Sequence, residues 1–202
     1  MCIRDRNITV GGNGKTPFVI WLANILKKNG YKPGIISRGY KSVSKKFPLS
    51  VDSDTQVYDS GDEAKIISNS TQCPLVVGPK RVDSSKYLLD NYDCDVLITD
   101  DGLQHYALGR DIEIAMVDGI KKFGNKLMLP AGPLREPIKR LNEVDFIVNT
   151  NSFCNNESER KQNEFLMTYK PISWINICTK KTYEIHDLSL IHISEPTRRY
   201  AL

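Results

Sequence analysis

A loop that could hold the phosphates of a nucleotide lies near the start of the chain. Three glycines let its backbone turn tightly with the N–H groups facing one concavity, and Lys15 adds a positive charge where β- and γ-phosphates would lie. Thr16 would offer its hydroxyl to Mg²⁺. The residues expected to contact the nucleotide are Thr9, Val10, Gly11, Gly12, Asn13, Gly14, Lys15 and Thr16.

The match to the phosphate-loop pattern G-x-x-x-x-G-K-[ST] covers its second half, because Thr9 stands where the pattern has glycine. The alternative is a glycine turn with an incidental lysine. The residues that follow favour the phosphate loop, since Pro17 can begin a helix and the apolar spacing after it is that of a buried helical face. The apolar residues of that face are Phe18, Ile20, Trp21, Leu22, Ile25 and Leu26.

Two adjacent carboxylates, Asp100 and Asp101, follow a short apolar run. In phosphate-loop enzymes an acid at the end of a strand holds Mg²⁺ directly or through water. Neighbouring carboxylates repel each other unless they share a cation, so the pair predicts a magnesium site. The alternative is a solvated Asp-Asp-Gly turn. A lone histidine such as His105, a little further on, is more often a hydrogen-bonded structural group than a catalyst.

Short apolar runs alternate with helical patterns along the chain. The runs expected to form strands are 34–37, 74–78, 95–99, 112–118 and 146–149. Helices are expected from 17 to 28, from about 61–63, and after 79–81, whereas 41–60 is expected to be a loop or an excursion. This alternation predicts an α/β fold of the P-loop NTPase kind, with a mostly parallel sheet, helices on both faces, and ligands at the carboxyl ends of the strands.

The composition is that of a globular protein with one domain, or one domain and part of another. The chain has 202 residues, of which 40% are hydrophobic and 26% charged. A net charge of +4 with scattered basic residues does not favour nucleic-acid binding, but fits phosphate-bearing substrates or anionic lipid surfaces. Five cysteines with no C-x-x-C pair argue against a disulfide framework or a zinc site and favour a reducing, cytoplasmic compartment. We expect no transmembrane segment, because the longest apolar run is too short.

Several stretches together resemble the tetraacyldisaccharide 4′-kinase family, the lipid A 4′-kinases of Gram-negative bacteria. The matching stretches are 7–17, 37–40 (Ser-Arg-Gly-Tyr), 61–63 (Gly-Asp-Glu), 77–81 (Val-Gly-Pro-Lys-Arg), 100–105 (Asp-Asp-Gly-Leu-Gln-His) and 129–137 (Leu-Pro-Ala-Gly-Pro-Leu-Arg-Glu-Pro). They occur in the order found in the family, which itself has Thr at the position of Thr9. Asn13 departs from the Thr or Ser usual there. The resemblance covers roughly residues 7–188.

The resemblance implies transfer of the γ-phosphoryl group of ATP, with Mg²⁺, to the 4′-hydroxyl of a lipid A disaccharide 1-phosphate precursor. By position, Lys15 and the loop amides would hold the phosphates, and Thr16 with the pair Asp100 and Asp101 would place the metal. Glu136 is a further candidate near the metal. The family also implies that the intact protein works peripherally at the cytoplasmic face of the inner membrane, with no nucleic-acid partner.

The resemblance also assigns roles in catalysis. Asp62 would be the base on the sugar hydroxyl, and a carboxylate suits a loose phosphoryl transfer that needs the nucleophile oriented more than deprotonated. Arg81 and Arg135 would stabilise equatorial phosphoryl oxygens or grip the substrate phosphate, where a guanidinium fork is better than an ammonium group.

The ends differ from the rest of the chain, so we expect an internal fragment of the family. Residues 1–6 lack the pattern of a signal peptide or of the strand that normally feeds a phosphate loop, and 189–202 resemble translated sequencing-adapter read-through. Both are expected to be artefactual ends. Residues 7–170 would form the P-loop kinase core, incomplete at its amino-terminal side, and 171–188 would begin a truncated second domain.

Other functions stay open. Another P-loop ATPase or small-molecule ligase is possible, although partitioning ATPases have Lys where this chain has Val10. A nucleotide switch or metallochaperone GTPase would need Asn-Lys-x-Asp, whereas 149–152 read Asn-Thr-Asn-Ser. A non-catalytic nucleotide-binding fragment is the third alternative.

Overall fold

The computed structural model describes residues 1–40, 42–44, 46–100, 108–150, 162–170, 172–176, 179 and 181–184. The chain divides into two compact units, Met1–Met167 and Thr168–Leu202. The first unit contains β1 (Cys2–Asn7), α1 (Lys15–Lys28), β2 (Pro33–Ser37), β3 (Leu49–Ser50), α2 (Val57–Ser60), α3 (Asp62–Thr71), β4 (Leu75–Val77), α4 (Arg81–Asn91), β5 (Val96–Thr99), β6 (Ile112–Asp118), the 3₁₀ helix η2 (Ile138–Asn142), β7 (Phe146–Thr150) and β8 (Glu164–Met167). The described part of the second unit contains the antiparallel pair β9 (Ser173–Ile175) and β10 (Thr182–Glu184).

The first unit is built on one eight-stranded sheet in the order β3-β4-β2-β5-β1-β6-β7-β8. The seven strands β4, β2, β5, β1, β6, β7 and β8 are parallel to one another, and within this sheet, as far as it is described, only the two-residue β3 runs antiparallel to its neighbour. The predicted α/β fold with a mostly parallel sheet is confirmed. Because the strands are parallel, the segments that follow β2, β4, β5, β1 and β6 all leave from one edge of the sheet.

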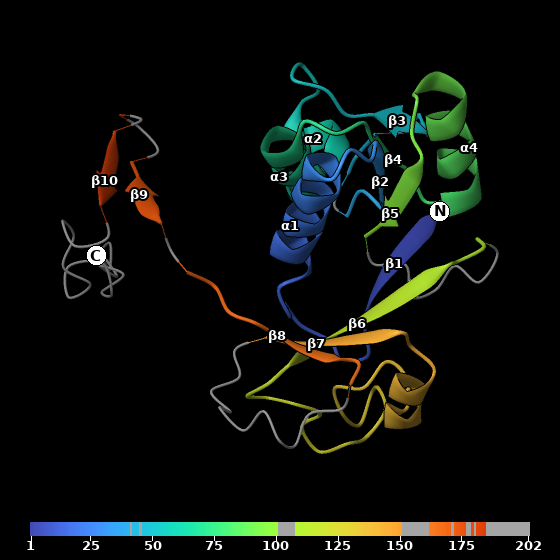
Figure 1. Cartoon of the computed structure of the whole chain (residues 1–202), viewed down its shortest axis with the longest axis vertical. Helices are drawn as coiled ribbons and strands as arrows, with labels where there is room; N and C mark the ends of the chain where they lie inside the picture. The colour runs from blue at the N-terminus through green and yellow to red at the C-terminus, as the bar shows by residue number, and fades with distance from the viewer. Residues whose placement is uncertain are drawn as a thin grey trace, which may run out of the picture. The chain divides into compact units, whose positions relative to one another are not determined.

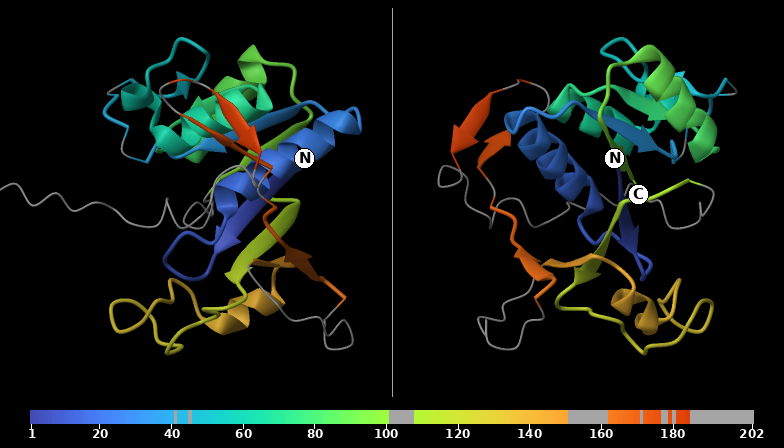
Figure 2. Two further views of the ribbon diagram at one scale, coloured as in Figure 1. Left: turned by 90° about the vertical axis from the view of Figure 1, so that its left-hand side faces the viewer. Right: turned by 45° about the vertical axis from the view of Figure 1, so that its right-hand side comes forward.

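Helices cover both faces of the sheet, as predicted (Figures 1 and 2). On one face α1 and α3 pack through Val19, Ala23 and Ile67 against β2, β4 and β5. On the other face α4 contributes Leu88 to a cluster with apolar residues of β1, β2, β4 and β5. Strands β2, β4 and β5 are therefore buried on both sides, which explains why they appear in the sequence as continuous apolar runs.

The expectation that residues 1–6 supply no strand is wrong, because β1 is one of the central strands of the sheet. It pairs with β5 from Cys2 to Arg4 and with β6 from Ile3 to Asn7, and it feeds the phosphate loop directly. Its charged residues hide the strand in the sequence. Arg4 is buried there, and its Nη2 donates to the carbonyl of Leu108 at 3.0 Å while Nη1 lies 3.9 Å from Glu113.

The expected buried face of the first helix is only partly correct. Phe18 is buried, and Leu22 and Leu26 pack against the core, but Trp21 and Ile25 are exposed. The residues that replace them on the buried side are Val19 and Ala23. The stretch 41–60, expected to be a loop, contains the short elements β3 and α2. Within the residues described, none of the helices has the length and apolarity needed to cross a bilayer.

Candidate functional site

The phosphate loop joins β1 to α1 and ends at Gly14, whose φ of 77° is a left-handed conformation that favours glycine. Lys15 and Thr16 form the first turn of α1, which contains no acidic residue. The first N–H groups of a helix have no partner within it, and the helix dipole makes this end attractive to anions. The loop and the start of α1 therefore form a site suited to phosphate.

The segment 131–136 holds the first half of this loop in place. The backbone N–H of Val10 donates to the carbonyl of Pro133 at 2.8 Å, and that of Arg135 donates to Ile8 at 2.7 Å. Thr9 forms a bridge with Leu134, which is fully buried. The Pro-Ala-Gly-Pro-Leu-Arg motif thus stabilises the phosphate loop through its backbone. This role was not predicted, because hydrogen bonds between backbone atoms do not depend on which side chains are present.

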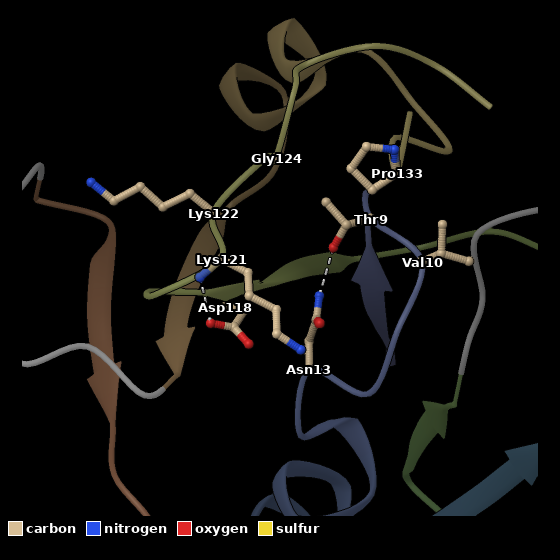
Figure 3. Close-up of a pocket in the computed structure, with 8 residues that line it drawn as sticks. All are labelled: Thr9, Val10, Asn13, Asp118, Lys121, Lys122, Gly124 and Pro133. Atoms are coloured by element: carbon tan, nitrogen blue, oxygen red, sulfur yellow. Dashed lines mark hydrogen bonds between the residues drawn. The ribbon is translucent and has the colours of Figure 1, made fainter. Parts of the chain in front are cut away.

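A second support comes from inside the loop. The side-chain amide of Asn13 donates to the hydroxyl of Thr9 at 2.8 Å, and both side chains are buried (Figure 3). The two positions at which the loop differs from the usual patterns, Thr9 and Asn13, are therefore bonded to each other. The hydrogen bond fixes the width of the turn that carries Gly11 and Gly12.

A cavity of about 360 Å³ lies beside this turn, between the phosphate loop and the segment after β6 (Figure 3). Its lining residues are Thr9, Val10, Asn13, Asp118, Lys121, Lys122, Gly124 and Pro133. Asp118 accepts the backbone N–H groups of Ile120 and Lys121, at 2.9 and 3.0 Å, and so shapes the turn that carries the two lysines. This lysine pair was not predicted as part of a site, although two adjacent basic residues after a strand are visible in the sequence.

Asp100 follows β5, next to the strand that feeds the phosphate loop. It is 3% exposed, and its Oδ2 accepts the Ser37 hydroxyl at 3.4 Å. Since β1 and β5 are adjacent and parallel, Asp100 and the Thr16 end of α1 lie at the same edge of the sheet. Asp101, the other predicted metal ligand, and His105 lie outside the described residues.

Asp62 is the first residue of α3, and its exposed carboxylate stands at the amino-terminal end of the helix. Gly61 before it has a φ of 85°, and a Cβ at this position would lie 2.5 Å from the carbonyl oxygen of Tyr40. Only glycine fits this close approach, so the Gly-Asp pair fixes the start of α3 against the segment that follows β2. Asp62 therefore lies at the same edge of the sheet as the phosphate loop.

The remaining predicted residues are engaged with other parts of the protein. Arg81 is 1% exposed; its Nη2 donates to the carbonyl of Asp100 at 2.6 Å and Nη1 to that of Gly78 at 3.4 Å. Glu136 forms an ion pair with Arg140, in which Nε lies 3.6 Å from Oε2. Arg135 is half-buried beside the phosphate loop. The predicted roles of these residues at phosphate or metal stay predictions.

The described cysteines are held as protonated thiols. Cys2, Cys73 and Cys94 are free thiols, and burial raises the pKa of each of them. A raised pKa keeps the thiol protonated and unreactive near neutral pH.

The residues present fit a magnesium ion bound together with nucleotide. Within the described ranges there is no cluster of three His, Cys, Asp or Glu side chains. Magnesium at a phosphate loop does not need one, because it keeps several waters and takes phosphate oxygens beside one or two protein ligands. A Thr16 hydroxyl and an Asp100 carboxylate at one sheet edge match that donor set.

The parallel sheet, the glycine-rich turn after its central strand and the helix that begins at Lys15 define a P-loop NTPase-like α/β protein. The sequence profile of the family described as LpxK, tetraacyldisaccharide-1-P 4′-kinase, matches residues 6–198. The chain belongs to this family, and the resemblance noted from its motifs is confirmed.

Individual relatives agree with this membership. A tetraacyldisaccharide 4′-kinase of Nitrosococcus oceani is 58% identical over 142 residues, 70% of this chain and 42% of that protein. One from Vibrio cholerae is 45% identical over 196 residues, 95% of this chain and 56% of that protein. The crystal structure of "apo" form LpxK from Aquifex aeolicus in complex with ATP superposes with a TM-score of 0.71 at 30% identity, over 86% of this chain and 55% of that one. The chain thus spans about half the length of the relatives it matches.

A more distant structure shares the fold alone. The signal recognition particle receptor FtsY from Elizabethkingia anophelis matches with a TM-score of 0.52 at 16% identity, over 84% of this chain.

Proposed function

We propose that this chain forms the nucleotide-binding core of an ATP-dependent kinase that phosphorylates the 4′-hydroxyl of a tetraacyldisaccharide 1-phosphate in lipid A biosynthesis. The observation that carries the proposal is the meeting of a phosphate loop, Asp100 and Asp62 at one edge of a sheet in a member of this family. The ATP in the related Aquifex aeolicus structure supports ATP as the phosphoryl donor.

The strand order places the nucleotide residues and the proposed base at neighbouring positions along this edge. The phosphate loop after β1 and Asp100 after β5 are adjacent, whereas Asp62 belongs to the helix that leads into β4, beyond β2. A nucleotide held by the phosphate loop would therefore have its terminal phosphate between the loop and Asp62, where the acceptor hydroxyl would bind. Such an arrangement would let the acceptor hydroxyl approach the terminal phosphate for a direct transfer.

The chain's own residues have distinct tasks in this mechanism. Lys15 and the loop N–H groups hold the phosphates and neutralise charge as it moves toward the leaving oxygen. Asp62 accepts the hydrogen bond of the sugar hydroxyl, orients it toward the phosphorus and takes its proton at the carboxylate oxygen. Thr16 and Asp100 would hold Mg²⁺, which supplies charge neutralisation on the phosphate oxygens.

The acceptor lipid implies a membrane partner. We infer that the intact protein contacts the inner membrane peripherally at its cytoplasmic face and has no nucleic-acid partner. Net charge of +4 supports attraction to anionic lipid and phosphate groups. Family membership favours a kinase over the other P-loop ATPases and ligases considered from sequence, and over a nucleotide switch.

The proposal is tested by offering a full-length protein that contains this chain Mg·ATP with labelled γ-phosphate and tetraacyldisaccharide 1-phosphate in mixed micelles. We expect label on the 4′-position of the lipid, separated by thin-layer chromatography. Lys15→Ala should abolish the transfer and weaken binding of a fluorescent ATP analogue by at least about tenfold, whereas the matched control Lys28→Ala should change neither. Release of labelled phosphate with the lipid unchanged would instead support an ATPase.

A further inference from the structure

Two lysines follow β6 on a turn whose backbone is held by Asp118. The carboxylate of Asp118 accepts the backbone N–H groups of Ile120 and Lys121, and its carbonyl accepts the N–H of Lys122 at 2.7 Å. Lys122 has a φ of 47°, in the left-handed region, so the chain changes direction at the second lysine. In Figure 3 the side chain of Lys121 extends toward Asn13, whereas that of Lys122 points away from the phosphate loop. The two neighbouring lysines therefore have different surroundings.

The turn that carries Lys121 is fixed to the phosphate loop. Gly124, at the end of this turn, has a φ of 54°, and a Cβ there would lie 2.9 Å from Cγ of Pro133. Pro133 accepts the backbone N–H of Val10 at 2.8 Å. The strands that lead into the loop and into the turn, β1 and β6, are themselves paired in parallel. The position of Lys121 relative to the loop is thus set before any ligand binds, as a precise contact requires.

Positive charge predominates on the two segments that enclose the cavity of about 360 Å³ between them. Residues 7–17 contain Lys15 and no acidic residue, and residues 119–135 contain four basic residues and no acidic one. Asp118 also lines the cavity, but it is 5% exposed and its carboxylate accepts N–H groups of its own turn. Among the residues that the structure describes, the ammonium group of Lys121 has no hydrogen-bond or ion-pair partner. The cavity therefore favours an anion.

The phosphate chain of a nucleotide is the anion that this position selects. The cavity is lined by Thr9, Val10 and Asn13, which belong to the part of the phosphate loop that precedes Lys15. Lys15 lies at the other end of the loop, where α1 begins. A triphosphate bound to one magnesium ion keeps more negative charge than a single lysine neutralises. This step rests on the proposed function, because it takes ATP as the ligand of the loop.

We propose that Lys121 is a second phosphate-binding lysine of the nucleotide site. It contacts the phosphate chain of ATP from the β6 side of the loop, while Lys15 contacts it from the start of α1. The ammonium group has three donors on a flexible stem, so it can follow the phosphate oxygens as charge moves during transfer. Lys122 takes no part in this contact.

The experiment measures the binding of Mg·ATP and of magnesium tripolyphosphate, by titration calorimetry, to a full-length protein that contains this chain. We expect Lys121→Ala to weaken the binding of both ligands by at least about tenfold, because each loses a charge-assisted hydrogen bond to phosphate. Lys121→Arg keeps the positive charge and should bind both ligands within about threefold of the unchanged protein. Circular dichroism checks that each variant is folded.

Lys122→Ala is the matched control, because it removes the same charge from the adjacent exposed residue. Its affinity for both ligands should stay within about twofold of the unchanged protein, since salt screens a charge that makes no contact. Equal affinities of the Lys121→Ala and Lys122→Ala variants would overturn the proposal, because general attraction to a basic surface would then explain both. Weaker binding of ATP with unchanged binding of tripolyphosphate would also overturn it, because Lys121 would then contact the nucleoside.

The result is independent of phosphoryl transfer, which this experiment does not measure. A protein that binds ATP through Lys121 without phosphorylating the lipid would contradict the proposed function alone. A protein that phosphorylates the lipid, and whose Lys121→Ala variant binds ATP as well as the unchanged protein, would contradict the role of Lys121 alone.

Discussion

Arg81 and Asp100 are joined by a 2.6 Å hydrogen bond from Nη2 of the arginine to the backbone carbonyl of the aspartate. The same guanidinium reaches the carbonyl of Gly78 at 3.4 Å, so one buried side chain ties the ends of β4 and β5 together. The arginine is thereby well placed to set the position of the Asp100 carboxylate, whatever contact it makes with phosphate.

We expect Arg81→Ala to lower the free energy of unfolding by about 2–4 kcal/mol, because it leaves two buried carbonyls without their charged donor. Urea denaturation measures this change. Arg38→Ala serves as the control, since an exposed arginine should alter stability by less than about 0.5 kcal/mol. An Arg81→Ala protein as stable as the unchanged chain would show that the guanidinium contributes nothing to the sheet edge.

Thr9 and Asn13 should be energetically coupled through their buried 2.8 Å hydrogen bond. We expect Thr9→Val and Asn13→Ala each to weaken binding of an ATP analogue, while the double variant is little worse than either alone. The expected coupling energy is about 0.5–1.5 kcal/mol, the net value of one such bond. Titration calorimetry on the four proteins completes the cycle. Strictly additive losses would mean that the bond does not shape the loop.

Asp62→Asn tests the proposed base while keeping the shape of the side chain. Turnover should fall by roughly 10²–10⁴-fold, because the amide cannot take the proton of the sugar hydroxyl, whereas the affinity for ATP should stay within about twofold. Transfer rates and binding of a fluorescent ATP analogue are measured side by side. Asp59→Asn, in the neighbouring helix α2, is the matched control and should retain activity. Parallel losses in turnover and nucleotide affinity would assign Asp62 a structural role.

The sequence predicted the parts of this fold whose signal is local. The apolar runs that became β2, β4, β5, β6 and β7 are continuous because both faces of each strand are buried, and the glycine pattern before Lys15 specifies its own turn. The strand order, by contrast, follows from packing between distant segments. Sequence spacing alone therefore could not show that Asp100 would lie next to the phosphate loop.

The misses have physical causes as well. Trp21 and Ile25 fit the helical apolar period, yet the face that packs on the sheet is turned toward Val19 and Ala23, because small and branched residues allow the close approach of α1. The hydrogen bond between Val10 and Pro133 is made by backbone atoms, so the types of the two residues do not indicate it. Strand β1 was missed because charged residues occupy positions that an apolar strand would normally fill.

The buried charged residues of β1 and β6 are expected to reduce the stability of the sheet. Arg4 and Glu113 lie opposite each other in the adjacent central strands β1 and β6, with Nη1 3.9 Å from Oε1, and they are 1% and 2% exposed. Arg110 lies 3.2 Å from the other carboxylate oxygen of Glu113. Removing one charge of such a group leaves the other in a poorly solvated place, whereas replacing both by apolar side chains removes the desolvation cost.

We therefore expect Arg4→Met alone to lower the free energy of unfolding by about 3–5 kcal/mol, or by less where Arg110 compensates part of the charge of Glu113. The double variant Arg4→Met/Glu113→Leu should recover at least the stability of the unchanged chain, because it removes both buried charges of the pair together with their desolvation cost. Urea denaturation of the four proteins in the cycle measures both effects. A double variant less stable than Arg4→Met would show that the ion pair itself stabilises the centre of the sheet.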